Sequence, residues 1–319
     1  MSNREITIEH LVKRYGEVTA VNGISLHVKS GQIYGFLGPN GAGKSTTIKI
    51  LTTLGLPTSG TAYVGGYDVI TQASDVRRIA GVALQDVGID PLMKAGELLT
   101  LQARLFGANP HDAKARADKL LQLVQLTDAA NRRVGTYSGG MKRRLDLAMA
   151  LVHKPEILFL DEPTTGLDPA SRRDIWREVR RLNQEIGITI FLTTQYLEEA
   201  DELADIIGII ANGKIVKTGS PAQLKASVGK ESLNLAFDNR ETAVQVRDLF
   251  TAEAVQAQVD RDTVRLYMEE AAHAIPQVID RLKQANLEPV SLTLTQPTLD
   301  DVFLQVTGQA LQTDAAPAI

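Results

Sequence analysis

The chain has 319 residues, of which 44% are hydrophobic and 23% charged, a balance that is ordinary for a globular protein with a core and does not suggest disorder. Its formal net charge of −4 argues against a protein that binds nucleic acid through a clustered basic surface. It contains no cysteine, so disulfides, thiolate metal sites and cysteine nucleophiles are excluded and a reducing compartment is expected.

The length suggests two domains, or one large domain with an appendage. The N-terminal residues lack the apolar core of a secretion signal. The apolar runs at 157–160 and 206–211 fall far short of the roughly 18 residues of a membrane span. We therefore expect no segment of this chain to cross a bilayer unaided.

Short apolar runs alternate with longer helical segments up to about residue 220, which is typical of an α/β domain. The predicted strands are 33–37, 157–160, 188–192 and 206–210, and the predicted helices are 46–54 and most of 96–130. The Asn-Gly pair at 212–213 predicts a tight hairpin turn. We expect an α/β domain over 1–222, with a helical subdomain at about 88–150.

The first motif is a glycine-rich loop, residues 38–45, with the sequence GPNGAGKS, which matches G-x-x-x-x-G-K-[ST] between a strand and a helix. Glycines let backbone N–H groups turn toward phosphate, Lys44 can reach the terminal phosphates and the Ser45 hydroxyl can ligate Mg²⁺. The alternative is a glycine-rich turn with an incidental lysine. The predicted nucleotide-binding residues here are Gly38, Asn40, Gly41, Gly43, Lys44, Ser45 and Thr46.

An acidic pair follows the predicted strand 157–160, at the strand end where ligands of open α/β sheets collect. Asp161 is predicted to hold Mg²⁺ or its water shell. Glu162 is predicted to polarise the water that attacks the γ-phosphate. The alternative is an acidic pair that faces solvent.

Residues 137–144 have the sequence YSGGMKRR, and here the chain resembles the ATP-binding-cassette (ABC) family, whose signature is Leu-Ser-Gly-Gly-Gln. Ser138, Gly139 and Gly140 match, whereas Tyr137 and Met141 replace Leu and Gln. The resemblance implies that this turn contacts the γ-phosphate held by the opposite subunit. The alternative is a serine N-cap on an ordinary helix. The three basic residues at 142–144 are expected to form a solvated helix face rather than a nucleic-acid site.

The resemblance extends over about residues 4–220 and implies further roles. Tyr15 resembles the adenine-stacking aromatic of the family. Gln85 resembles the glutamine that reaches Mg²⁺ and the attacking water and links to the membrane partner. Residues 163–169 resemble the D-loop, with Asp168 at the dimer contact.

Gln195 stands where the family usually has a histidine that bonds to the γ-phosphate. A glutamine amide can donate to phosphate but cannot become a cation, so γ-phosphate sensing without an imidazolium and slow to moderate turnover are expected. Together with 137–141 and 297–304, the segment 194–201 resembles the daunorubicin-resistance type of ATP-binding subunit, found in bacteria and archaea.

Beyond residue 220 the pattern changes to alternating and helical runs in the order β-α-β-β-α-β, which predicts a small α+β domain over 230–308. It has two interpretations, a regulatory or dimer-stabilising domain, which the resemblance favours, and a domain that binds a small ligand. Residues 309–319 are expected to form a flexible tail.

The resemblance implies an ABC-type P-loop ATPase fold that binds ATP and Mg²⁺. One chain carries one phosphate loop and one signature, so it implies a homodimer around two ATP that drives export of a hydrophobic drug-like compound through a separate membrane permease. The chain would lie at the cytoplasmic face of the membrane through that permease and bind no nucleic acid. The alternatives are an ABC ATPase acting on nucleic acid or ribosomes, and a nucleotide-gated switch without appreciable hydrolysis.

Overall fold

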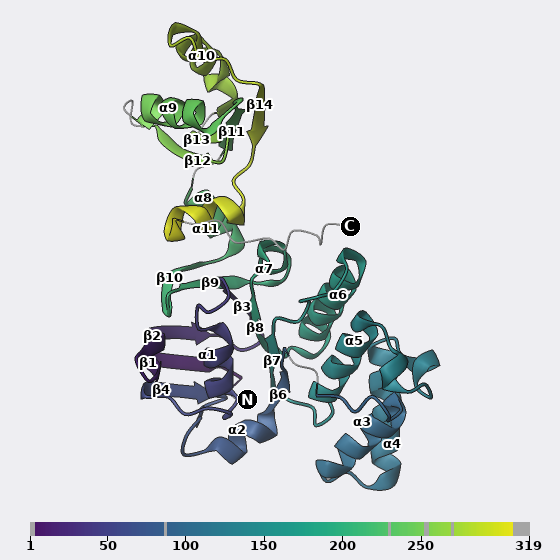
Figure 1. Ribbon diagram of the computed structural model, residues 1–319. Helices are drawn as coiled ribbons and strands as arrows, with labels where there is room; N and C mark the ends of the chain where they lie inside the picture. The colour runs from purple at the N-terminus through teal and green to yellow at the C-terminus, as the bar shows by residue number, and fades with distance from the viewer. Residues whose placement is uncertain (1–3, 86–87, 229–230, 252–254, 269–270, 309–319) are drawn as a thin grey trace. The chain divides into compact units, whose positions relative to one another are not determined.

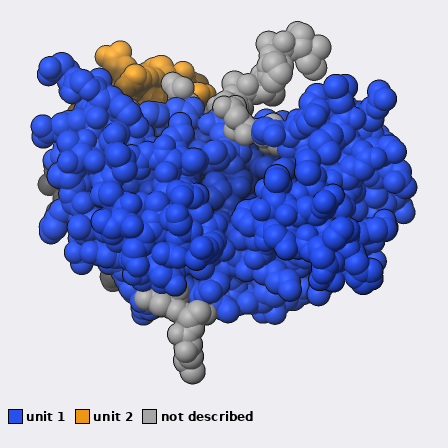
Figure 2. Space-filling view, turned by 90° about the horizontal axis from the view of Figure 1, so that it is seen from below, with its two compact units in different colours: residues 1–220, 311–319 blue, residues 221–310 orange. Residues whose placement is uncertain are grey.

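The computed structural model describes residues 4–308, apart from 86–87, 229–230, 252–254 and 269–270 (Figure 1). The described residues divide into two compact units, one up to Ser220 and the other from Pro221 onward (Figure 2). The predicted tail at 309–319 lies outside the described residues. None of the helices in the described ranges is long and apolar enough to cross a membrane.

The first unit contains an antiparallel sheet that the sequence analysis did not predict. Its strand order is β2-β1-β4-β5. The strands are β1 (Ile6–Tyr15), β2 (Val18–Val28), β4 (Ser59–Val64) and β5 (Tyr67–Asp68). The buried side chains of β1 and β2 face a core that they share with the central sheet, so this small sheet covers one side of the unit.

The central sheet of the first unit has six strands in the order β10-β9-β3-β8-β7-β6, and all except β10 run parallel. Its strands are β3 (Ile33–Leu37), β6 (Ala80–Ala83), β7 (Ile157–Asp161), β8 (Thr189–Thr194), β9 (Ile206–Ala211) and β10 (Lys214–Gly219). The four predicted strands are confirmed, although β7 and β8 run on to the polar residues at their ends. The predicted hairpin turn is also confirmed, with Asn212 and Gly213 both at positive φ.

Helices cover both faces of this sheet. They are α1 (Lys44–Leu51), α2 (Ala73–Ile79), α3 (Ala95–Leu105), α4 (Pro110–Leu123), α5 (Gly139–Ala150), α6 (Pro169–Ile186) and α7 (Leu197–Leu203). Alternate residues of β7 face different cores, since Phe159 belongs to the core with α1 and the antiparallel sheet while Leu158 belongs to the core with α5 and α6. This double burial explains why the central strands are apolar throughout.

Both segments predicted to be helical are helical, but the helices begin and end at residues other than those predicted. The segment 96–130 is mostly helical, with α3, α4 and a short turn at Thr127–Ala129. The helix predicted at 46–54 is α1, which begins earlier because Gly43 is its N-cap and ends earlier because Thr53 has φ 63°. A threonine in the left-handed region cannot continue the helix.

The second unit contains α8 (Pro221–Ala226), β11 (Glu231–Ala236), α9 (Arg240–Thr251), β12 (Gln256–Asp260), β13 (Thr263–Met268), α10 (Ala271–Gln284), β14 (Ser291–Thr295) and α11 (Leu299–Thr307). From β11 to β14 this is the predicted β-α-β-β-α-β order. The strands form an antiparallel sheet in the order β12-β13-β11-β14. One face of the sheet packs on α9 and α10 around a separate hydrophobic core.

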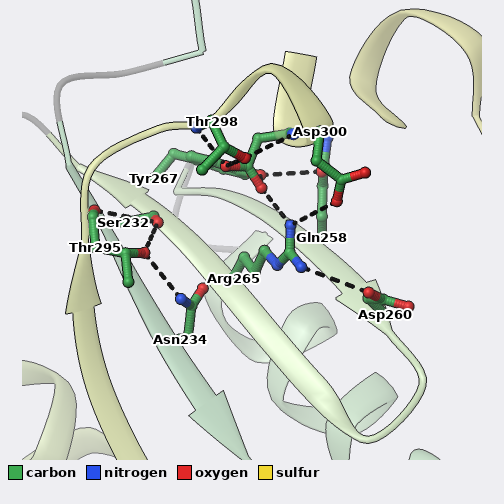
Figure 3. A network of polar contacts seen from close by, with 10 residues as sticks. Ser232, Asn234, Gln258, Asp260, Arg265, Tyr267, Thr295, Thr298 and Asp300 are labelled. Atoms are coloured by element: carbon green, nitrogen blue, oxygen red, sulfur yellow. Dashed lines mark hydrogen bonds and ion pairs between the residues drawn. The ribbon is translucent and has the colours of Figure 1, made fainter. Parts of the chain in front are cut away.

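A polar network attaches α11 to this sheet (Figure 3). Arg265 on β13 bonds to Asp301 and lies 3.5 Å from Asp300 and from Asp260. Tyr267 Oη donates to Asp301 Oδ1 at 3.1 Å, and Thr298 forms a capping box with Asp301. The segment 297–304 therefore forms a helix whose N-terminal turn is fixed to the sheet by charge-assisted hydrogen bonds.

Candidate functional site

The loop at 38–45 connects β3 to α1 and is shaped by close backbone contacts. A Cβ atom at Gly38 would lie 2.3 Å from the carbonyl oxygen of Ile210. A Cβ atom at Gly43, whose φ is +109°, would lie 2.3 Å from the carbonyl oxygen of Ala20. Only glycine fits these two positions. The loop therefore has the tight path that lets backbone N–H groups at the start of α1 face an anion.

Lys44 lies inside this loop with its ammonium group bound to the protein. Its Nζ donates to the carbonyl oxygens of Gly38 (2.8 Å) and Pro39 (3.1 Å) and lies 3.1 Å from Glu162 Oε1. Burial lowers the pKa of Lys44, while the charges of Glu162 and Asp161 oppose that shift. The ammonium group of Lys44 is thus paired with the Glu162 carboxylate.

Asp161 is buried at the end of β7 and receives two hydroxyl groups. Ser45 Oγ donates to Asp161 Oδ1 at 3.2 Å, and Thr193 Oγ1 donates to the same oxygen at 2.5 Å. A carboxylate beside a serine hydroxyl is a set of hard oxygen donors that fits Mg²⁺ completed by phosphate and water. The residues present therefore suit the predicted metal.

Glu162 has φ 48°, a left-handed conformation that non-glycine residues rarely adopt. Its N–H donates to the carbonyl oxygen of Thr193 at 3.1 Å, and Thr165 Oγ1 donates to Glu162 Oε2 at 3.2 Å. This backbone turns the carboxylate toward Lys44 instead of toward solvent, and only 6% of the residue is exposed. A strained residue of this kind is common at catalytic sites.

The signature turn lies at the start of α5. Ser138 is its N-cap and its Oγ accepts from the Met141 N–H at 3.2 Å, so the N-cap interpretation is correct for the side chain. Ser138 and Gly139 are exposed. Tyr137 is buried and its Oη donates to the carbonyl oxygen of Ala129 at 2.6 Å. Within the described ranges, no hydrogen bond or ion pair joins Ser138–Gly140 to the loop at 38–45 of the same chain.

The remaining predicted residues lie in different surroundings. Tyr15 ends β1 and is 54% exposed, with Lys13 Nζ 4.8 Å from its ring centroid. Gln85 is exposed just after β6, and Gln195 is half-buried just after β8. Asp168 is the N-cap of α6, and hydrogen bonds from Ser171 lower the pKa of its carboxyl group. The structure thus brings together Lys44, Ser45, Asp161 and Glu162.

Arg143 is not part of a solvated helix face, and that prediction is wrong for this residue. It is 7% exposed and donates to the carbonyl oxygens of Pro163 (2.7 Å), Asp161 (2.9 Å) and Leu84 (2.6 Å). It also bonds to Asp146 Oδ2 at 3.0 Å, and burial raises the pKa of Asp146 to about 6 while Arg143 opposes that shift. Arg143 therefore ties α5 to the segments that carry Glu162 and Gln85.

Sequence reasoning also missed Thr193, which holds Asp161. A signal was available, because β7 and β8 are parallel neighbours and Asp161 is paired with Thr193 across them. Polar residues that end two adjacent parallel strands meet at the same edge of the sheet.

Comparison with known proteins gives two family matches. The family described as "ABC transporter" matches residues 21–165, and the family described as "ATP-binding protein DrrA1-3-like, C-terminal domain" matches residues 219–307. The daunorubicin/doxorubicin resistance ATP-binding protein DrrA of Streptomyces peucetius is 42% identical, over 96% of this chain and 93% of that protein. The Nod factor export ATP-binding protein I of Burkholderia orbicola is 37% identical, over 98% of this chain and all of that protein.

Solved structures resemble the first unit. A dimeric structure of a post-hydrolysis state of the ATP-binding cassette MJ0796, bound to ADP and Pi, has a TM-score of 0.62 and 26% identity. It covers 67% of this chain and 98% of that chain. The structure of cbiO1 from Clostridium perfringens, with a TM-score of 0.65 at 24% identity over 71% of this chain and 92% of that chain, shares the fold. These similarities confirm the predicted α/β ATPase fold.

Proposed function

The chain belongs to the ABC transporter family of ATP-binding proteins, whose ATP-binding domains hydrolyse ATP, and from this premise we propose that Lys44, Ser45, Asp161 and Glu162 form its hydrolytic site. The observation that carries the proposal is their convergence. Lys44 Nζ lies 3.1 Å from Glu162 Oε1, and Ser45 Oγ lies 3.2 Å from Asp161 Oδ1. Their elements β7 and α1 meet at the carboxyl edge of the parallel sheet, where ligands of such sheets bind.

In the proposed mechanism, Lys44 exchanges Glu162 for the terminal phosphates when ATP binds. Ser45, Asp161 and Gln85 would hold Mg²⁺, which neutralises charge on the phosphate oxygens when bound. The exchange frees the Glu162 carboxylate to accept a proton from the attacking water. Gln195 would donate its amide N–H to the γ-phosphate, and Tyr15 would stack on the adenine.

The complete site is proposed to need two copies of the chain. Each copy exposes Ser138 and Gly139, and no hydrogen bond within the described residues joins them to its own phosphate loop, which supports a head-to-tail pair with the signature turn of one copy on the nucleotide of the other. Asp168 would lie at this contact. The resemblance to a dimeric cassette structure also supports such a pair.

Removal of Mg²⁺ tests the ATPase proposal directly. Ser45 and Asp161 would bind the triphosphate only through Mg²⁺, which would neutralise much of its charge, so phosphate release by the purified chain is expected to fall at least about 100-fold in excess EDTA and to return with added Mg²⁺. Phosphate release is measured with a coupled assay, and binding of a fluorescent ATP analogue is followed in parallel. ATP binding with no Mg²⁺-dependent phosphate release would favour the non-hydrolysing switch instead.

A groove on the first unit is the proposed permease site. It has a volume of about 440 Å³ and is lined by residues of α2, α3 and α5, among them Arg77, Asp146 and Met149. Phe106 lines it, is 50% exposed and stacks on His153 with ring centroids 4.3 Å apart. An apolar rim of this kind suits an amphipathic helix from a cytoplasmic loop. Asp146 joins the groove to Arg143 and so to the backbone around Glu162.

Phe106→Asp is expected to weaken permease binding at least about tenfold, because the variant would place a carboxylate where the permease would cover an aromatic ring. Basal phosphate release of the isolated chain should stay within about twofold, since Phe106 touches no residue of the proposed hydrolytic site. Affinity for the permease in detergent and ATPase stimulation in proteoliposomes provide the measurements. Ile186→Asp, at another exposed apolar residue, is the matched control. Full stimulation of Phe106→Asp would exclude this groove.

The cargo is proposed to be a hydrophobic drug-like or related compound, exported through that permease, with the chain held at the cytoplasmic face of the membrane. Relatives named for daunorubicin and doxorubicin resistance support this proposal, while one named for Nod factor export widens the range of cargo. Residues 1–222 are proposed as the ATPase domain, with a helical subdomain at 88–150. Residues 230–308, which have their own core, are proposed as a regulatory or dimer-stabilising domain.

A further inference from the structure

We propose that Glu199 and the Arg172–Tyr196 pair are positioning groups that hold the segment bearing Gln195 against the segment that follows Glu162. The proposal rests on the hydrolytic site proposed above. None of these three residues belongs to the predicted site. Arg172 lies on α6, Tyr196 is the N-cap of α7 and Glu199 lies on α7.

Glu199 lies on α7 and is fully buried. Its Oε1 accepts a hydrogen bond from Thr164 Oγ1 at 2.8 Å and another from Trp176 Nε1 at 2.9 Å. Thr164 follows Glu162 closely in sequence and is itself fully buried, and Trp176 belongs to α6. One carboxyl oxygen therefore joins three elements, namely the helix after Gln195, the segment after Glu162, and α6.

The surroundings of Glu199 favour an uncharged acid. Burial raises the pKa of Glu199, and hydrogen bonds from Thr194, Thr164 and Trp176 together with the charge of Arg143 oppose that shift only in part. The role of Oε1 as a neutral acceptor can therefore be reproduced by the amide of glutamine.

A second link joins the same two segments nearer the surface. The guanidinium of Arg172 lies 4.1 Å from the ring centroid of Tyr196, the residue after Gln195. Arg172 Nε also donates to the carbonyl oxygen of Leu167 at 3.0 Å, within the segment that follows Glu162. The cation–π contact and the hydrogen bond thus fix both segments to one side chain.

Gln195 is flanked in sequence by residues that are held in place on both sides. Thr193 on one side bonds to Asp161 and to the N–H of Glu162, and Tyr196 and Glu199 lie on the other side. An uncharged amide attracts phosphate less strongly than an imidazolium, so its effect depends on placement. A displacement of about 1 Å is enough to cost about 100-fold in rate.

The experiment compares Glu199→Ala with Glu199→Gln in the full chain, by steady-state phosphate release and by binding of ATP without Mg²⁺. Glu199→Ala is expected to lower kcat at least about tenfold while KM for ATP stays within about threefold, and Glu199→Gln is expected to retain at least about half of the wild-type kcat. Glu178, a buried glutamate of α6 whose partner is Arg181, supplies the matched control Glu178→Ala. If Glu199→Ala and Glu178→Ala lose kcat equally, and in proportion to their loss of stability, Glu199 has only a structural role. That outcome would overturn the proposal.

Tyr196 keeps the proposal testable if Glu199→Ala does not fold. Tyr196→Phe retains the ring under Arg172 and should keep kcat within about twofold, whereas Tyr196→Ala should lower kcat about fivefold or more with unchanged ATP affinity. A Glu199→Gln variant as inactive as an alanine variant, or a Tyr196→Ala variant with wild-type kcat, would contradict the proposal. If the wild-type chain itself releases no phosphate, the proposed hydrolytic function is refuted. That result is distinct from any difference between the variants, which tests the positioning role.

Discussion

Replacing Glu162 with glutamine is expected to lower ATP hydrolysis at least about 100-fold while ATP still binds. The amide cannot accept a proton from the attacking water. It also removes the anion that pairs with Lys44 at 3.1 Å, so phosphate no longer has to displace a carboxylate. The affinity for ATP is therefore expected to rise, by about tenfold at most, and not to fall.

The same variant tests the two-copy site. Because hydrolysis no longer removes the γ-phosphate, Glu162→Gln with ATP and Mg²⁺ should accumulate as a dimer in light scattering, with ADP giving monomers. Glu156→Gln is the control, since Glu156 directly precedes β7, at the strand end opposite the site. Normal hydrolysis by Glu162→Gln would remove Glu162 from its role, and ATP-bound monomers, both alone and with the permease, would refute the shared site.

Lys44→Ala is expected to weaken ATP binding about 100-fold and to leave no measurable hydrolysis, because the only buried ammonium group in the loop is removed. It should also destabilise the nucleotide-free chain by about 3 kcal/mol, since Glu162 is left as a buried carboxylate without its cation. Urea unfolding and isothermal titration with ATP give the two values.

A double variant separates the two effects of the lysine. Lys44→Ala combined with Glu162→Gln should recover most of the lost stability but none of the lost affinity. Lys49→Ala, on the exposed side of α1, is the control for a change of charge on the same helix. If Lys44→Ala binds ATP as tightly as the Lys49→Ala control, the loop is not a phosphate site.

Much of the fold could be predicted because its central strands are apolar on both faces. The runs at 33–37 and 157–160 can only be buried strands or buried helix, and their short length favours strands. The antiparallel sheet was missed because β1 and β2 mix buried and exposed residues around several register shifts. Irregular pairing of that kind leaves no clear period in the sequence.

The site residues that belong to short sequence motifs could be predicted. The contacts between them that depend on an unusual backbone conformation could not. The loop at 38–45 and the pair Asp161–Glu162 follow from their motifs. The contact of Lys44 with Glu162 depends on the left-handed backbone of Glu162, which no residue pattern specifies. The burial of Arg143 was not predicted, because a run of three basic residues suggests an exposed helix face. Only the middle residue of that run is buried.

The phenol of Tyr137 has a mechanical consequence. Because its hydroxyl is bonded to Ala129 and its ring belongs to the same hydrophobic core as Leu120 and Val124, a shift of Ser138 would disturb that core. We therefore expect the exposed amides that follow Tyr137 to move together with α4 and α5 and not as a separate loop.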